Sequence, residues 1–346
     1  MKSIAIGGYL ELGGAYFNCL NGKFLHYGML MNILVTGGLG AVGTALIPEL
    51  EKQGHSVFVI DLDTHHFAQN YARVDVSEFR QLEQLWLGGG WERGYFNSPK
   101  KFDMVFHLAA EFGRWNGEDY YETLWKTNAI GTKNILKMQE KEGFKAVYFS
   151  TSEVYGDFQD VMLESVMDNY EVKQMNDYAL TKWVNEQQVM NSAVMSGTQS
   201  VRVRLFNSYG PGEYYSPYRS VICLFSYCAL HNLPFTVYKD HYRTSIYISD
   251  VVRALANITQ NFNAGEVYNI GGEDYHNIET VAEKILDYLK LDDKLVSYRE
   301  SEILTTRQKK VDSTKAQRDL GLKITVNLDE GIQNTIEWMK KVYKPG

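Results

Sequence analysis

The stretch that decides the fold covers residues 32–43 and reads NILVTGGLGAVG. It is a short apolar run, then a turn in which Gly37, Gly40 and Gly43 are three residues apart, and then the start of a helical pattern. A strand, a glycine turn and a helix in this order are typical of a dinucleotide pyrophosphate site. Gly37 permits the tight turn, Gly40 leaves room for a phosphate, and Gly43 lets the helix lie close on the strand. The phosphates are expected at the N-terminus of the helix, where free N–H groups favour negative charge.

The next apolar run, residues 56–61, ends in Asp61, 18 residues after Gly43. A carboxylate at the end of this second strand accepts hydrogen bonds from the ribose hydroxyls of a dinucleotide. Because it would repel a 2′-phosphate, Asp61 favours NAD over NADP. Glycine turns without a ligand are common, and an aspartate can also end a solvated strand. Further residues are therefore needed to distinguish a cofactor site from a glycine turn and a strand end that bind no ligand.

Composition excludes several classes of function. The chain has 346 residues, 45% of them hydrophobic, which allows roughly two domains of about 150 residues each. Its 35 Lys and Arg against 42 Asp and Glu give a net charge of -7, so no nucleic-acid partner is expected. Three cysteines without metal-ligand spacing favour a reducing, cytoplasmic location and no bound metal. No apolar run reaches the roughly 18 residues of a membrane span, so no membrane partner is expected.

Periodicity predicts an α/β fold with a doubly wound parallel sheet. Strand patterns alternate with helical patterns along the chain, at residues 32–36, 56–61, 71–76, 104–110 and 146–150. His107, inside one of these apolar runs, is interpreted as a core histidine. Pro48 is a misfit, because it lies within the first helical pattern and should kink it. Residues 1–30 lack this alternating pattern and are interpreted as an N-terminal extension without a part in the chemistry.

The ends of two strands supply further candidates for cofactor contacts. Asp75 is placed to hydrogen-bond an adenine amino group and Val76 to pack on the ring, although Asp75 could equally close a turn. The 104–110 run ends in Leu108, Ala109 and Ala110, two of which have side chains small enough for a flat ligand to approach. Ligands bind at this edge of open α/β sheets.

The residues that carry chemistry come after the last of these strands. Thr151 leaves the predicted sheet edge, and Tyr178 and Lys182 lie four residues apart on a helical stretch, on one helix face. A free phenol has a pKa of about 10 and is a poor base at neutral pH. We expect the Lys182 ammonium and a nicotinamide cation to lower the pKa of Tyr178, which then takes a hydroxyl proton while hydride leaves the substrate. Thr151 joins the same hydrogen-bond chain.

These motifs resemble those of the extended short-chain dehydrogenase/reductases, and among them the nucleotide-sugar epimerases, dehydratases and decarboxylases. The resemblance covers nearly everything from Met31 to the C-terminus. The matching residues are Thr36 to Gly43, His107 to Ala110, Asn128 with Gly131-Thr132, Thr151 to Gly156, Tyr178 to Lys182, Asn207 with Tyr209 to Pro211, and Arg243 with Asp250.

The resemblance implies a Rossmann domain over residues 31–206 that holds NAD. It implies a smaller α/β domain over 207–346 that holds a nucleoside-diphosphate sugar, with some segments returning to the first domain. It also implies a homodimer through helices at about 119 to 140 and 177 to 195. The cofactor contacts predicted from the residues and the resemblance together are Gly37, Gly40, Ala41, Val42, Gly43, Asp61, Asp75, Val76, Leu108, Ala109, Ala110, Asn128, Tyr178 and Lys182.

The resemblance also assigns substrate contacts, to Ser152, Asn207, Arg243 and Arg307. Asn207 is similar to an amide that contacts the sugar diphosphate, and Arg243 to an arginine that binds phosphate, a role that suits a guanidinium fork. Arg307 is a second such arginine in this interpretation. A common alternative position for it in the family is Lys309.

The enzymes that this chain resembles first oxidise a sugar hydroxyl, usually that at carbon 4. The step that follows this oxidation determines the type of reaction. Glu153 is placed to remove the carbon 5 proton in a 4,6-dehydratase, or is merely a loop carboxylate. The Thr-Ser-Glu order at residues 151–153 is similar to GDP-mannose dehydratases and UDP-glucuronate decarboxylases. We expect an NAD-dependent nucleotide-sugar epimerase or dehydratase with Thr151, Tyr178, Lys182 and Glu153 as catalytic residues. The alternatives are a UDP-glucuronate decarboxylase-like enzyme, which Lys309 in place of arginine disfavours, and a non-catalytic NAD-sensing protein.

Overall fold

The computed structural model describes residues 29–63, 70–87, 99 and 101–343, together with the backbone of four strands between residues 5 and 27. These four strands form an antiparallel sheet of their own and are β1 (Ala5–Ile6), β2 (Tyr9–Leu12), β3 (Ala15–Leu20) and β4 (Lys23–Tyr27). The rest of residues 1–28 of the predicted N-terminal extension, and the side chains of these strands, lie outside the described residues. Its interpretation as a segment without a part in the chemistry stays a prediction.

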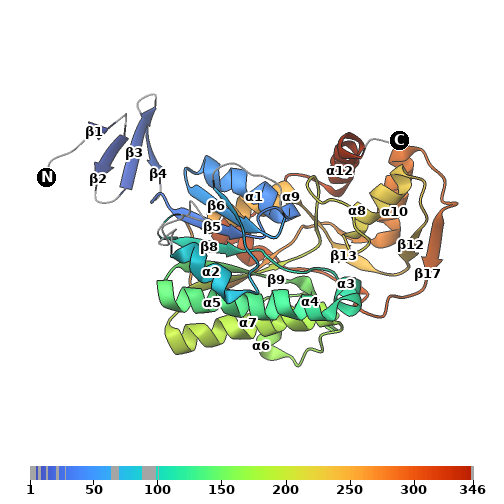
Figure 1. Cartoon of the computed structure of the whole chain (residues 1–346). Coiled ribbons are helices and arrows are strands. Elements are labelled where there is room, and N and C mark those ends of the chain that lie inside the picture. The colour runs from blue at the N-terminus through green and yellow to red at the C-terminus, as the bar shows by residue number, and fades with distance from the viewer. Residues whose placement is uncertain are drawn as a thin grey trace.

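A seven-stranded parallel sheet forms the centre of the described chain (Figure 1). Its strands in spatial order are β15 (Val267–Ile270), β10 (Ser200–Leu205), β9 (Lys145–Thr151), β8 (Met104–His107), β5 (Asn32–Thr36), β6 (Ser56–Asp61) and β7 (Tyr71–Arg73). The predicted fold class is confirmed. Strands β7 and β8 end three residues earlier than predicted, so residues 74–76 and 108–110 lie in the loops just beyond the sheet edge.

Helices cover both faces of this sheet (Figure 1). One face carries α1 (Ala41–Lys52), α9 (Ile248–Asn257) and α11 (Thr314–Leu320), and the other α2 (Phe79–Trp86), α5 (Gly131–Glu142) and α7 (Asp177–Ser196). The chain reaches α5 through α3 (Arg114–Asp119), α4 (Tyr121–Trp125) and the π-helical turn η1 (Lys126–Ile130). Because each strand is covered on both sides, apolar residues occur without alternation, as expected of a parallel sheet.

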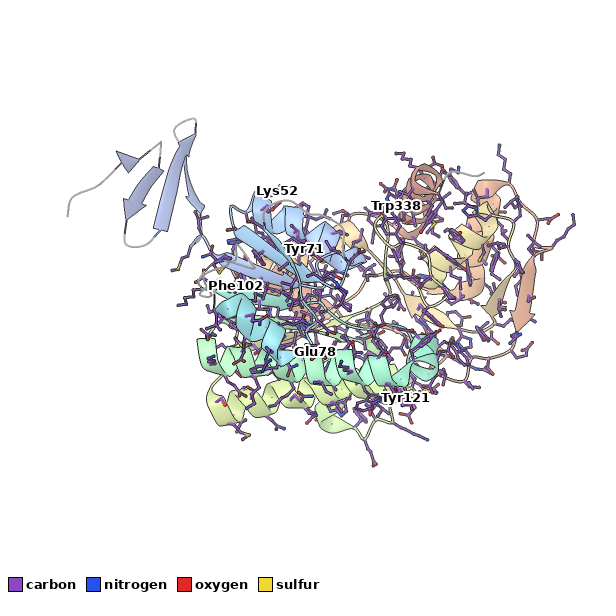
Figure 2. All side chains as sticks on the ribbon, viewed as in Figure 1. Lys52, Tyr71, Glu78, Phe102, Tyr121 and Trp338 are labelled. Carbon is purple, nitrogen blue, oxygen red and sulfur yellow. The ribbon has the colours of Figure 1, made fainter. Side chains whose placement is uncertain are left out.

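The helices on each face pack against the sheet and form two hydrophobic cores. In β5, Ile33 and Val35 point into the core under α1 and α9, while Leu34 points into the core under α2 and α5. Phe102 belongs to the second core, where its ring packs on Phe58 and on Trp86 of α2 (Figure 2).

One prediction about a single residue is decided here, and the kink expected at Pro48 stays a prediction. His107 is buried and hydrogen-bonds the hydroxyls of Thr36 and Thr132, and burial, with a further contribution from Lys182, lowers its pKa to about 3. It is a core histidine, as predicted. Helix α1 continues across Pro48 to Lys52.

The glycine turn between β5 and α1 is built from close backbone contacts. Gly37 has φ +67°, and a Cβ on it would lie 2.6 Å from the backbone N and Cα of Ala109 in the loop after β8. A Cβ on Gly43 would lie 2.6 Å from the Cα and O of Gly38. Gly43 therefore lets the helix pack closely on Gly38 of the turn, whereas the prediction was a close contact between the helix and the strand.

The rest of the chain forms smaller sheets beside the large one. They pair β11 (Ser208–Tyr209) with β14 (Ile246–Tyr247), β12 (Phe235–Tyr238) with β17 (Val296–Arg299), and β13 (Tyr242–Thr244) with β16 (Tyr275–Asn277) and β18 (Gln308–Lys309). Helices α8 (Val221–Leu230), α10 (Ile278–Leu289) and α12 (Leu328–Val342) pack with one another here. Strand β15 pairs with β10, so the chain returns to the large sheet after residue 207. The exact domain boundary at 206/207 stays a prediction.

A buried ion pair lies beneath the carboxyl ends of β9 and β10. The Arg204 guanidinium donates to both carboxylate oxygens of Glu186 on α7, at 2.9 and 2.8 Å, and to the Tyr155 hydroxyl at 2.9 Å. Tyr155 belongs to the 3₁₀ turn η2 (Ser152–Tyr155) and donates to Asn269 on β15. The Ser150 hydroxyl donates to the same Glu186 carboxylate at 2.6 Å. This network joins α7 and η2 to three strands of the sheet.

We predict that Arg204→Met lowers the free energy of unfolding by about 3–5 kcal/mol, because it leaves the Glu186 carboxylate buried without its main partner. Chemical denaturation followed by circular dichroism measures this. Lys239→Met, which removes a pair on the surface with Glu300, is the control and should cost less than about 1 kcal/mol. Equal effects of the two substitutions would contradict the importance of the buried pair.

Candidate active site

A cavity of about 530 Å³ lies at the carboxyl edge of the large sheet. It extends from the glycine turn, past the ends of β6, β8 and β9, to the start of α7 and the segment after β10. All the predicted cofactor contacts line it except Asn128. Residues that are far apart in sequence are thus brought together as predicted.

The glycine turn leaves this cavity open where a phosphate is expected. A Cβ on Gly40 would have one neighbour within 4 Å, the Gly37 carbonyl oxygen at 3.3 Å, so the space beyond it is free. Asp61 at the end of β6 accepts hydrogen bonds from the backbone N–H of Leu39 at 2.9 Å and of Leu62 at 2.7 Å. The carboxylate is therefore fixed beside the turn, and the arrangement fits a dinucleotide.

Two other predicted cofactor contacts make hydrogen bonds within the protein. One oxygen of Asp75 accepts from the N–H of Ser77 at 2.8 Å and its hydroxyl at 2.6 Å. The Asn128 amide accepts from the N–H of Glu111 at 2.9 Å and donates to the Glu111 carbonyl and the Thr181 hydroxyl. Asn128 is thus turned away from the cavity and holds the loop after β8 against α7.

The predicted catalytic residues Thr151, Tyr178 and Lys182 converge on the same cavity. Thr151 ends β9. Tyr178 is the second residue of α7, whose N-cap Asn176 accepts a hydrogen bond from the N–H of Ala179 at 2.8 Å. The Thr151 hydroxyl hydrogen-bonds the Tyr178 hydroxyl. The Lys182 ammonium donates to the Phe149 carbonyl at 3.0 Å and lies 5.9 Å from the Tyr178 ring centre.

The structure corrects the predicted effect of Lys182 on the pKa of Tyr178. Burial raises the pKa of Tyr178, the hydrogen bond with Thr151 offsets part of this effect, and the Glu153 charge adds to it. Burial also lowers the pKa of Lys182 to about 8. The protein alone therefore keeps Tyr178 protonated. A positive charge bound beside the phenol would lower the pKa of Tyr178.

A second cavity of about 420 Å³ adjoins the first, and Arg114 and Asn207 line both. Arg243 lines the second cavity, and its role as a contact with phosphate stays a prediction. Its guanidinium is buried and is fixed by the carbonyls of Tyr242 and Arg307, at 2.8 and 2.9 Å. Asn207 donates to the Thr244 carbonyl and has a φ of 41°.

Arg307 is not brought to the site. Its side chain is exposed and is not among the described residues that line either cavity. The reason is the parallel register of β13 and β18, in which Lys309 is paired with Arg243. Lys309, the alternative position, is buried and reaches Glu153.

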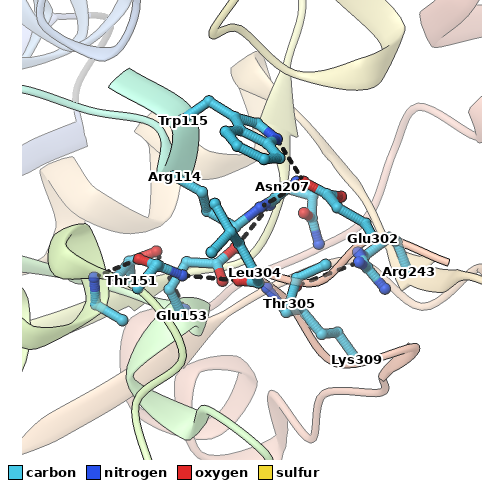
Figure 3. A network of polar contacts seen from close by, with 12 residues as sticks. Arg114, Trp115, Thr151, Glu153, Asn207, Arg243, Glu302, Leu304, Thr305 and Lys309 are labelled. Carbon is cyan, nitrogen blue, oxygen red and sulfur yellow. Dashed lines mark hydrogen bonds and ion pairs between the residues drawn. The ribbon is translucent and has the colours of Figure 1, made fainter. Parts of the chain in front are cut away.

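Glu153 lies between two cations where the cavities meet (Figure 3). Its carboxylate pairs with Lys309 and with the Arg114 guanidinium at 3.0 Å. Burial alone would raise the pKa of Glu153, but Lys309 and Arg114 outweigh it and hold the pKa well below its usual value. This argues against the predicted role of Glu153 as a base, since a strongly acidic carboxyl makes a weak base.

Arg114 and Glu302 complete the cluster and were missed by sequence reasoning. Glu302 pairs with Arg114 at 2.9 Å and accepts a hydrogen bond from the indole N–H of Trp115 at 3.1 Å. The dense aromatic and charged run of residues 112–121 at a strand end was a signal for Arg114. Glu302 lies in a segment without any motif.

Comparisons with known proteins agree with this geometry. A model of the NAD dependent epimerase/dehydratase family matches residues 33–271. The chain is 30% identical to the UDP-N-acetyl-alpha-D-glucosaminuronate decarboxylase of Bacillus cytotoxicus, a match that covers 91% of this chain and 99% of that protein. It is 28% identical to the dTDP-glucose 4,6-dehydratase of Salmonella typhimurium, over 89% of this chain and 92% of that protein. The solved structure of the epimerase Mth375 of Methanothermobacter thermautotrophicus has a TM-score of 0.79 and 25% identity, and covers 91% of this chain and 94% of that one.

We predict that Asp61→Asn lowers the ratio of NAD to NADP affinity by about tenfold, because it removes charge-assisted hydrogen bonds to the ribose and the repulsion of a 2′-phosphate. Isothermal titration with both dinucleotides measures the ratio. Asp103→Asn is a matched control, because Asp103 caps the N–H of Asn32 at the opposite end of β5. An unchanged ratio in Asp61→Asn would show that the ribose lies elsewhere.

Proposed function

Because this chain belongs to the NAD dependent epimerase/dehydratase family, we propose that it oxidises a nucleotide sugar at carbon 4 and then decarboxylates it. It is an enzyme, and its cofactor is NAD. The proposed substrate is a UDP-linked uronic acid, whose sugar carries a carboxylate at carbon 6. Among the relatives, the decarboxylase of Bacillus cytotoxicus supports this choice.

The observation that carries the proposal is the charge of the cluster between the cavities. Three basic side chains, Arg114, Arg243 and Lys309, face two carboxylates, Glu153 and Glu302. Burial lowers the pKa of Lys309 to about 7, and the cluster has an excess of one positive charge whenever Lys309 is protonated. Glu153 follows Thr151 by two residues, so the cluster borders the position of the reacting sugar. A positive excess in a buried site favours an anionic group on the substrate.

We propose that Tyr178, Thr151 and Lys182 carry out the first step. Tyr178 and Thr151 share a hydrogen bond in the first cavity, where the carbon 4 hydroxyl would donate its proton to the Tyr178 oxygen. Lys182 is held by the Phe149 carbonyl on the same side. When bound, NAD accepts a hydride and places a positive ring near these residues.

The second step needs no base at carbon 5. A ketone at carbon 4 is β to the carboxylate at carbon 6, so the bond between carbons 5 and 6 breaks with its electrons delocalised onto the ketone oxygen. CO₂ leaves, and a proton returns to carbon 5. This fits a Glu153 carboxylate that is held by two cations, whereas a 4,6-dehydratase would need it as a base. We therefore favour decarboxylation over dehydration as the reaction of this enzyme. The sequence alone favours the opposite choice. Epimerisation at carbon 4, which needs only Thr151, Tyr178 and Lys182, is the second candidate.

We also propose that the chain forms a homodimer in the cytoplasm. The helices expected at the interface expose apolar side chains, among them Tyr121, Ile130 and Leu180. Such exposure on neighbouring helices is typical of protein interfaces. None of the described helices is both long and apolar enough to cross a membrane.

The function is tested with UDP-glucuronate and UDP-N-acetylglucosaminuronate, and with UDP-glucose and dTDP-glucose as neutral sugars. We expect release of CO₂ from at least one uronate, seen by mass spectrometry and NMR of the product. Arg114→Met should lower kcat/KM for the uronate by about tenfold to a hundredfold, since it removes a charged hydrogen-bond partner. Arg307→Met, at an exposed side chain close by, should leave it unchanged. Conversion of a neutral sugar with none of either uronate would refute the proposal.

A further prediction concerns Tyr178→Phe, which removes only the phenol oxygen. We expect at least about a hundredfold loss of activity, as is usual when a general base is removed, with NAD affinity within about twofold. Stopped-flow absorbance of reduced cofactor, together with titration calorimetry, separates the two effects. If the variant forms reduced cofactor at the normal rate, Tyr178 is not the base.

A further inference from the structure

All three nitrogens of the Arg114 guanidinium are bound by carboxylates of the protein itself (Figure 3). Nη1 donates to Glu153 at 3.0 Å. Nε donates to Glu302 at 3.2 Å, and Nη2 donates to the two oxygens of Glu302 at 3.0 and 2.9 Å. These four bonds use four of the five N–H groups of the guanidinium. An anionic group of a substrate can therefore bind it through two N–H groups only if one of the two carboxylates leaves.

The two carboxylates are held very differently. Glu153 lies in the 3₁₀ turn η2, where its N–H donates to the Thr151 hydroxyl and its carboxylate also pairs with buried Lys309. Glu302 lies between β17 and β18 in a segment without regular structure. Its N–H reaches only His241, at 3.4 Å, and the next residue, Ile303, is 73% exposed. The Glu302 side chain is itself only 7% exposed, but among the described residues its carboxylate pairs with no second cation such as Lys309, and its backbone is held less firmly. Glu302 is therefore the more easily displaced of the two carboxylates.

Glu302 faces the same cavity as the Arg114 guanidinium that it holds. Both Glu302 and Arg114 line the second cavity, and Arg114 also lines the first. A uronate carboxylate that replaces Glu302 restores the same charge-assisted contacts, and the released Glu302 is hydrated. A neutral sugar offers no such replacement, because displacing Glu302 would leave a charged guanidinium only partly paired.

We propose that Glu302 is a specificity-determining residue that competes with the substrate carboxylate for Arg114 and so sets the affinity for that carboxylate. This rests on the proposed function, since it needs an anionic sugar. After CO₂ is lost, the sugar has no group to hold Arg114. Glu302 then returns to the guanidinium, which weakens the hold on the product.

The test is equilibrium binding in the Tyr178→Phe background, where turnover is blocked. Glu302→Gln keeps the shape of the side chain but loses its charge, and it should bind UDP-glucuronate about tenfold more tightly. Its affinity for UDP-glucose should stay within about twofold. Glu300→Gln is the matched control, because this exposed neighbour pairs only with Lys239 on the surface. It should change neither affinity.

Weaker or unchanged binding of UDP-glucuronate by Glu302→Gln would overturn the inference and make Glu302 a structural anchor of Arg114. A protein that binds UDP-glucose but not UDP-glucuronate, before any change at residue 302, would instead refute the proposed function. The two failures are thus distinguishable.

A second measurement does not depend on a substitution at Glu302. The indole N–H of Trp115 donates to Glu302, so displacement of this carboxylate should change the emission of Trp115. UDP-glucuronate should produce the change and UDP-glucose should not, and Trp115→Phe should abolish it. Equal responses to the two nucleotides would contradict displacement of Glu302.

Discussion

The Glu153 carboxylate holds together the parts of the molecule on which the chemistry depends. Arg114 comes from the start of α3, Glu153 from the turn after β9, and Lys309 from a small sheet that also carries Arg243. Buried charges are stable only when they are paired and hydrogen-bonded. The two cations therefore fix where the second cavity meets the first. They also keep Glu153 ionised and weakly basic, which limits the reactions that the site can run.

The buried network around Arg204 and Glu186, beneath this cluster, holds the catalytic residues in position. Thr151 ends a strand, and Tyr178 and Lys182 lie on the helix that crosses it. Glu186 follows Lys182 by one helical turn and takes the Arg204 guanidinium with both of its oxygens. The same network of side chains therefore supports the turn that carries Glu153 and the helix that carries Tyr178. The residues proposed for catalysis are held by packing and paired charges of the large sheet and α7. The residues proposed for selectivity come from segments outside this sheet.

Sequence patterns predicted the parts of the site that are built locally. The glycine turn, Asp61 and the pair Tyr178 and Lys182 each follow from short motifs on one strand or helix. The contacts of Arg114 with Glu302 could not be predicted this way, because the two residues are 188 positions apart and meet only through the tertiary fold. Arg307 was misplaced because the pairing of β18 with β13 sets Lys309 opposite Arg243 and leaves Arg307 before the strand. The raised pKa of Tyr178 was missed because it depends on burial, which a motif does not reveal.

The measurement that bears most directly on this account is a crystal structure of the Tyr178→Phe variant with NAD and UDP-glucuronate. The account predicts the sugar carboxylate within hydrogen-bond distance of the Arg114 guanidinium and the carbon 4 hydroxyl next to Thr151 and the ring of residue 178. A sugar bound in the opposite sense, with its carboxylate in solvent and carbon 4 away from Thr151, would contradict it.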